Sequence, residues 1–270
     1  MAIAVHPRLA GVGFDVAYRG STEPQTLDVV LELTGPAELP LAPWAVGGFV
    51  ACVNRGLAGS SDFAPSMGRA ALEAGPTGEG DPAPDELGPR YAFRLLVAGV
   101  APVFLRVFVE HLAGCAHPSE LKTISIVGSL PPDGTRLSVR DRELEGWLTE
   151  PSAYPRAWPE PGFRVETRSI PRGATIEVSL EKGELAPFAT ELEETISTWQ
   201  TALLGYPNAK RQGRGASEPH ASFARTRTSL HAKLGLFDHA RGPAQAALVN
   251  ALTRFHTTVA RIAEVAISMP

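Results

Sequence analysis

The sequence predicts an α+β fold made of two tandem pseudo-repeats, each with the element order β-β-α-β-α-β, an antiparallel or mixed sheet and two helices packed on one face. Three observations predict this class. Short sequence blocks recur at a nearly constant offset, two of these blocks alternate apolar and polar residues, and a third begins like a helix. The length of 270 residues suits one large domain or two smaller ones.

Four blocks recur in the same order along the chain. The first two recur at an offset of 149 residues, the third at 144 and the fourth at 146. The matching segments are 13–19 and 162–168, 26–32 and 175–181, 41–45 and 185–189, and 57–59 and 203–205. Four matches in one order indicate an internal duplication. The alternative is that strands and helix starts reuse common residues.

The first two blocks of each half predict half-buried strands, because their apolar residues occupy alternate positions. We expect Val16 and Tyr18 to share one face of the first strand. Proline and glycine at 171–173 are typical of a turn, which predicts that the first two strands form a hairpin.

The third block predicts a helix in each half, because its proline suits the first turn, where the missing N–H costs nothing. The expected helices cover 43–58 and 187–204 and end near Gly59 and Gly205.

The rest of each half is predicted from the same patterns. An acidic, Pro/Gly-rich insertion is expected at 60–90 and a basic loop at 206–222. Next come a strand, a helix and a closing strand, at 91–98, 101–115 and 121–127 in the first half and at 225–236, 242–260 and 262–268 in the second. The last segment could instead continue the helix. The expected domains are 1–130 and 162–270, joined by a linker at 131–161.

Composition excludes several classes of protein. A hydrophobic fraction of 44% is too high for a disordered chain, and a net charge of −4 makes nucleic acid an improbable partner. A local basic patch at 210–214 leaves contact with an acidic partner open. We find no signal peptide and no membrane-spanning run, so the expected location is cytoplasmic. Abundant Gly, Pro and Arg suggest a GC-rich bacterial source.

The sequence predicts no cofactor, no metal site and no catalytic residue. Cys52 and Cys115 fall in apolar helical stretches and are expected to be buried thiols. No zinc-ligand spacing or nucleotide-binding motif is present. Asp238 and His239 form a weak acid–base candidate, and His256 is expected on a helix surface.

The strongest candidates for a functional surface are charged residues that alternate with the apolar ones. They would line the sheet face opposite the helices, where acids and bases form cross-strand pairs. These binding candidates are Arg19, Glu32, Arg168, Glu181, His231 and Lys233. The face could be merely solvated, could be an interface, or could hold a ligand.

Two hypotheses about function follow. The first is a non-enzymatic interaction or assembly protein, whose two similar modules bind a protein partner or self-associate as an oligomer. The alternative is an enzyme or small-molecule binder with its site at the junction of the two repeats.

Overall fold

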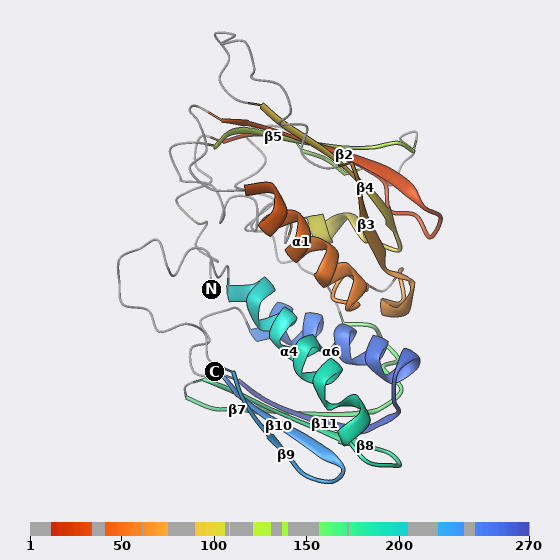
Figure 1. Cartoon of the computed structure of the whole chain (residues 1–270), viewed down its shortest axis with the longest axis vertical. Coiled ribbons are helices and arrows are strands. Elements are labelled where there is room, and N and C mark those ends of the chain that lie inside the picture. Colours follow the sequence, from red (N-terminus) through yellow and green to blue (C-terminus); the bar gives the residue numbers. More distant parts are fainter. Residues whose placement is uncertain are drawn as a thin grey trace. The chain divides into compact units, whose positions relative to one another are not determined.

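A computed structural model gives the structure of the chain (Figure 1). It describes residues 12–33, 41–60, 62–74, 90–105, 108, 121–130, 137–139, 157–171, 173–204, 221–234 and 241–269. The chain divides into two compact units. Unit 1 comprises Met1–Asn54 and Met67–Pro155, and unit 2 comprises Arg55–Ser66 and Arg156–Pro270.

Unit 1 contains a six-stranded mixed sheet with the order β3-β4-β2-β5-β1-β6. Strands β1 and β5 are parallel, and the other neighbouring pairs are antiparallel. Its elements are β1 (Gly13–Tyr18), β2 (Gln25–Leu33), α1 (Leu41–Asn54), β3 (Arg69–Ala74), β4 (Arg90–Ala98), β5 (Leu121–Gly128) and β6 (Leu137–Val139), with a short 3-10 helix at Pro102–Phe104. A second 3-10 helix, Pro65–Met67, falls at the point in the sequence where the chain returns from unit 2 to unit 1.

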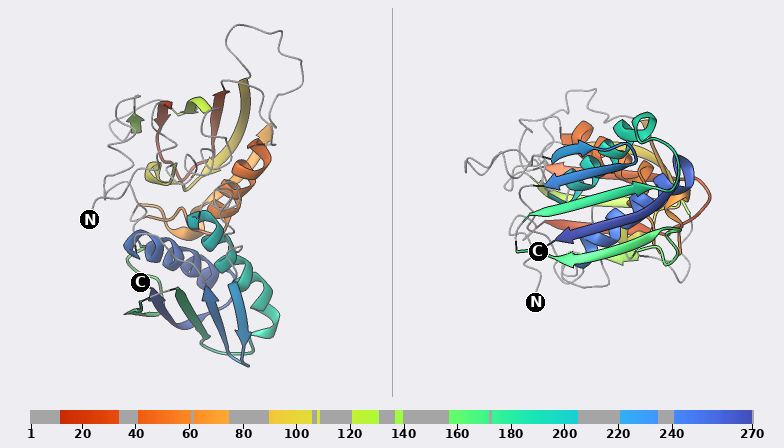
Figure 2. Two further views of the ribbon diagram at one scale, coloured as in Figure 1. Left: turned by 90° about the vertical axis from the view of Figure 1, so that its left-hand side faces the viewer. Right: turned by 90° about the horizontal axis from the view of Figure 1, so that it is seen from below.

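Unit 2 contains a five-stranded mixed sheet with the order β7-β11-β8-β10-β9. Only β7 and β11 are parallel neighbours. Its elements are β7 (Arg164–Ser169), β8 (Ala174–Leu180), a 3-10 turn (Ala186–Phe188), α4 (Ala189–Leu204), β9 (Ala221–Arg225), β10 (Ser229–Leu234), α6 (Arg241–Thr258) and β11 (Ile262–Met269). Helices α4 and α6 cover one face of this sheet (Figure 2).

The two sheets share one topology. If β1 to β5 are matched with β7 to β11 in chain order, the five strands have the same spatial order and the same directions. The fold thus contains two similar sheets, an arrangement compatible with the predicted duplication. Both sheets have more strands than predicted. In the first, β3 lies inside the expected insertion at 60–90 and β6 inside the expected linker at 131–161. In the second, β10 is the strand expected at 225–236, and the additional strand β9 begins inside the expected basic loop at 206–222.

The predicted hairpins are wrong. Strands β1 and β2 do not pair with each other, because β5 lies between them, and β11 likewise lies between β7 and β8. The turn at Pro171 and Gly173 reverses the chain as expected, but it passes over the end of β11, where Ile170 N donates to Met269 O at 3.0 Å. Turn chemistry fixes the reversal of direction and does not exclude a third strand between the two.

The buried faces follow the predicted alternation. In unit 1, Val16, Tyr18 and the apolar side of β2 are buried, and Phe49 stacks on Phe108 with ring centroids 4.3 Å apart. In unit 2, Trp199 lies fully buried between the helices and donates to Ala244 O at 2.8 Å. Burial also raises the pKa of the Cys52 thiol to about 12, as expected for an unreactive thiol.

Some boundaries differ from the prediction, and some predictions lie outside the described residues. Helix α1 ends at Asn54, and the left-handed glycine beyond it is Gly56 with a φ of 85°, not Gly59. The closing segment 262–268 is strand β11, which excludes the helical alternative. The predicted helix at 101–115 is described only at its start, where Leu105 and Phe108 are buried. The described part of the chain leaves out most of the linker and most of the basic loop. It also leaves out Cys115, Gly205, Asp238 and His239.

Candidate functional site

Each sheet carries an acid–base pair at the same place on the face opposite its helices. In unit 1, Asp28 of β2 lies directly across from Arg94 of β4, and Arg94 Nε is 2.6 Å from Asp28 Oδ1. In unit 2, Glu177 of β8 lies across from His231 of β10, with 3.5 Å between Oε1 and Nε2. The predicted cross-strand pairs therefore exist in both halves.

The equivalence of these pairs bears on their chemistry. Arg94 cannot act as a general base, because a guanidinium stays protonated, and the hydrogen bond that it donates to Asp28 raises its pKa further. His231 occupies the matching position, and its side chain is 44% exposed. The two halves thus share a cross-strand pair of an acidic and a basic side chain, and a catalytic dyad is not what is repeated.

The predicted residues Glu32 and Glu181 do not occupy equivalent environments. Glu32 lies inside β2 and accepts a hydrogen bond of 2.7 Å from Thr123 Oγ1. Glu181 lies just past the end of β8 in an exposed turn, where its backbone N–H donates to Arg261 O at 2.9 Å. Strand β2 runs further than β8, which accounts for the difference.

The other three predicted residues have different local surroundings. Arg19 follows β1 and is half-buried, and its carbonyl accepts a 2.7 Å bond from Gln25 Nε2. Arg168 lies on the edge strand β7, with its guanidinium 3.4 Å from Glu166. Lys233 is exposed on β10 opposite Thr175. Arg19 and Glu32 belong to unit 1, whereas Arg168, Glu181, His231 and Lys233 belong to unit 2.

The open face of the second sheet is polar. Register places its residues in rows across the strands, and the row through the centre runs from Glu166 over Ala266 and Glu177 to His231. The row beside it runs over Arg168, Ser268, Thr175 and Lys233. Small side chains at Ala266 and Ser268 separate the charged ones, which matches the predicted polar face.

The open face of the first sheet is more apolar at matching positions. Leu96 replaces Lys233, since each lies opposite a threonine of the neighbouring strand. Val127 likewise replaces Ala266, since each lies opposite the acid of the ion pair. Among the described residues, four large hydrophobic side chains are exposed, and all four belong to unit 1: Met67, Leu72, Leu96 and Val127.

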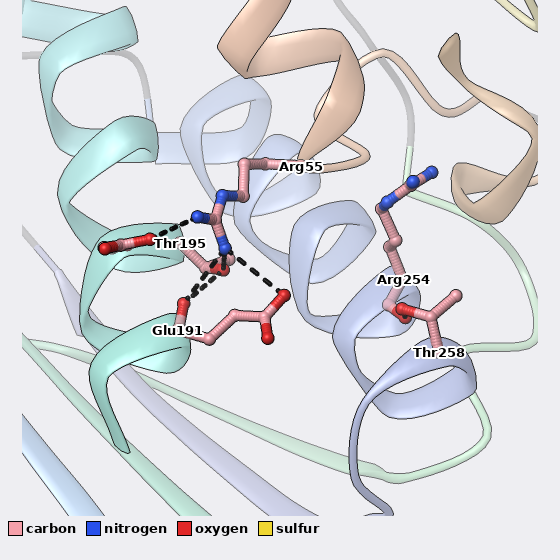
Figure 3. Close-up of polar contacts among 6 residues, drawn as sticks. Arg55, Glu191, Thr195, Arg254 and Thr258 are labelled. Atoms are coloured by element: carbon pink, nitrogen blue, oxygen red, sulfur yellow. Dashed lines mark hydrogen bonds and ion pairs between the residues drawn. The ribbon is translucent and has the colours of Figure 1, made fainter. Parts of the chain in front are cut away.

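Sequence analysis missed a polar cluster in unit 2 that is built on the segment Arg55–Ser66. The guanidinium of Arg55 points at α4, where it contacts Glu194, Glu191 O at 3.3 Å and Thr195 Oγ1 at 3.3 Å (Figure 3). On the α6 side, Arg254 donates to Pro65 O and Ser66 O, each at 3.2 Å. The cluster therefore joins this segment to both helices of unit 2.

Asn250 is the buried centre of the same arrangement. Its Nδ2 donates to Gly59 O at 2.8 Å, and its Oδ1 accepts from Trp158 N at 2.7 Å. The side chain is fully buried, so both bonds replace bonds to water. An asparagine within the apolar run of α6 is the sequence signal that could have indicated this contact.

The hydrogen bonds of Arg55, Arg254 and Asn250 join segments of the same chain, and we identify no cofactor site among the described residues. Among them, no group of three or more His, Cys, Asp or Glu side chains could hold a metal ion. Within the same ranges, no helix is long and apolar enough to cross a membrane. No protein-family model matches the sequence, and no curated protein matches it significantly.

Proposed function

We propose that the chain is a non-enzymatic interaction protein that binds a protein partner through the open face of its first sheet. We call this surface the first open face and define it by Asp28, Arg94, Leu96 and Val127. The observation that carries the proposal is the one-sided placement of exposed apolar side chains. Leu96 is 39% and Val127 42% exposed, whereas the described part of unit 2 exposes no large hydrophobic side chain.

Duplication makes this difference informative. Both sheets descend from one pattern, and the second sheet shows that lysine and alanine fit the positions of Leu96 and Val127. A solvated sheet face gains little from exposing leucine and valine to water, whereas apolar side chains around a charged pair are the usual anatomy of a protein interface. Unit 1 also contains Met67 and Leu72, each 48% exposed, although Leu72 lies opposite the buried Leu95 and so belongs to the other face.

The alternative, a small-molecule or catalytic site, has weaker support. Its best residue pair, Glu177 and His231, matches an aspartate–arginine pair in the other half, which supports a structural role for both. A cytoplasmic location and a bacterial source stay predictions from the sequence.

The test uses Leu96→Lys, which installs the residue type that the second sheet carries at the equivalent position. Affinity capture from the native host, followed by mass spectrometry and binding to the purified partner, compares the variant with the wild type. We expect partner binding to weaken about tenfold or more, because a lysine in an interface core is desolvated without a partner charge.

Lys233→Ala is the matched control, since it changes the equivalent position on the other sheet. We expect it to bind the partner as the wild type does. The proposal is wrong if the wild type retains no specific protein, or if Leu96→Lys binds the same partner with unchanged affinity.

A further inference from the structure

The two halves differ at one edge of their sheets. In unit 1, β6 pairs antiparallel with β1, with Val16 across from Val139 and Tyr18 across from Leu137. The matching strand of unit 2, β7, pairs with β11 on one side. Among the described residues, no strand pairs with its other side. The fold thus carries one edge that is occupied and an equivalent edge that is open.

Burial agrees with this difference. In β1, Val16 is fully buried and Tyr18 is 1% exposed. The matching residues of β7 are Val165, which is half-buried, and Thr167, which is exposed. An added strand beside β7 would cover both side chains, as the structure around β1 covers theirs.

Alternate residues of β7 direct their backbone N–H and C=O groups away from the sheet. Ile170 N donates inward to Met269 O, and the N–H and C=O groups of successive strand residues point to opposite sides. Arg164, Glu166 and Arg168 therefore direct their backbone groups toward β11. Val165 and Thr167 direct theirs away from the sheet, as do Val16 and Tyr18 toward β6.

The side chains of β7 are complementary to a second copy of themselves. The strand reads Arg-Val-Glu-Thr-Arg-Ser, so its charges alternate in sign at every second position. If two copies pair antiparallel about Thr167, Glu166 of each lies opposite Arg168 of the other, which gives two ion pairs. If they pair about Glu166, like charges face each other throughout. Pairing about Val165 would also give two ion pairs, between Arg164 and Glu166, but it would leave Arg168 and Ser169 opposite residues that precede β7. Charge and strand length together therefore select the register centred on Thr167.

We infer that two copies of this chain associate through β7, with Thr167 on the twofold axis, and form one continuous sheet from their second units. Edge strands usually carry charge to prevent such pairing, most often unpaired lysine. Here each charge finds its opposite in the partner strand. The inference deepens the proposed interaction role by naming a second copy as one partner, and it uses a different sheet from the first open face.

Sedimentation velocity and light scattering on the full chain, at concentrations up to about 200 μM because edge pairing alone buries a modest area, test the inference. We expect the wild type to reach the mass of two chains. Glu166→Arg and Arg168→Glu each place like charges opposite one another twice, so each variant alone should associate about tenfold more weakly. Lys182→Glu, in an exposed turn, is the matched charge-reversal control and should associate as the wild type does.

The decisive sample is an equimolar mixture of the two variants. In the mixed pair, both arginines of one chain face both glutamates of the other, so association should return to wild-type strength or above. A wild type that stays monomeric, or variants that dimerise as well as the wild type, would overturn the inference. Retained partner binding by a monomeric wild type would still leave the first open face supported, so the two proposals fail separately.

Discussion

Protonation of one buried imidazole, that of His256, can make the stability of the turn after α6 depend on pH. His256 lies at the end of α6 with 6% of its surface exposed, and its Nδ1 accepts the backbone N–H of Ile262 at 2.9 Å. Its Nε2 faces the Arg261 guanidinium, also at 2.9 Å. A neutral imidazole has one acceptor nitrogen, and both neighbours can only donate. The fixed backbone donor therefore takes Nδ1, and Nε2 carries the hydrogen toward the cation.

This environment opposes protonation of the ring. Burial and, after it, the Arg261 charge lower the pKa of His256 below its usual 6.5. Since the folded-state pKa is lower than the unfolded one, the unfolded chain binds more protons between the two values. The free energy of unfolding should therefore fall as pH drops below about 6.5 and level off below the folded-state pKa.

Substitution of His256 separates the hydrogen bond from the titration. His256→Asn keeps an acceptor for Ile262 N–H and cannot titrate, so its stability should change less than that of the wild type between pH 7 and pH 5.5. His256→Ala leaves that buried N–H unpaired and should cost about 1–3 kcal/mol at pH 7. Urea unfolding at a series of pH values measures both effects. Equal pH slopes for the wild type and His256→Asn would contradict this assignment.

Sequence patterns predicted which side of a strand is buried better than what a lone polar residue does. Val16, Tyr18 and Leu27 are buried as the alternation indicates. His256 was expected on a helix surface and is buried, because the covering residue Phe163 comes from a distant segment. Local periodicity records the faces of an element, and it carries no information about which segment covers them.

At the scale of elements, the end of α1 depends on one glycine. Gly56 has a φ of 85°, and a Cβ placed there would lie 2.7 Å from Arg254 Cβ of α6. Neither Cβ atom could move away from the other by a change of rotamer, because the backbone fixes the position of each. The chain can therefore leave the helix and pass along α6 only with glycine at this position.

Gly56→Ala should destabilise the protein by about 2 kcal/mol or more, through the strained backbone and the close approach to α6. Gly47→Ala is the control from the same helix, because its φ is ordinary and nothing lies within 4 Å of the new methyl. We expect that control to raise stability by about 0.5–1 kcal/mol. Thermal or urea unfolding distinguishes the two, and similar effects at both sites would contradict this account of Gly56.

The order of strands could not be predicted, although most strands were. Both halves insert their fifth strand between their first two, so β5 and β11 each lie between strands that are neighbours in sequence. The alternating patterns of β5 and β11 fit either a central or an edge position. Pairing over a hundred residues of chain depends on packing of the whole sheet, which no turn motif encodes.

At the scale of the whole molecule, the boundary between the units does not follow the boundary between the repeats. Arg55–Ser66 follows α1 in the first repeat, yet it packs within unit 2. Leu57 and Ala58 of this segment are buried, and its carbonyls bond to Asn250 and Arg254 of α6. The repeated sequence blocks identify ancestry, whereas compactness follows contacts, and the two need not coincide after duplication.

A chain cut between Pro155 and Arg156 should therefore stay associated. The fragment 1–155 carries Arg55–Ser66, and the fragment 156–270 lacks the segment that satisfies Asn250 Nδ2 and the Arg254 guanidinium. When co-expressed with a tag on one fragment, the two should copurify. The fragment 156–270 alone should unfold at lower urea concentration, because it exposes an apolar surface and loses the hydrogen bonds that Asn250 and Arg254 donate to the segment.

Arg55→Ala should weaken that association about tenfold, because it removes the contacts with Glu191, Glu194 and Thr195 together. Arg227→Ala is the matched control, since Arg227 is 82% exposed and its ion pair with Glu184 lies wholly within the second fragment. Titration of one purified fragment with the other measures both variants. If the two fragments folded independently and did not bind each other, the segment 55–66 would pack with the first repeat and not with unit 2.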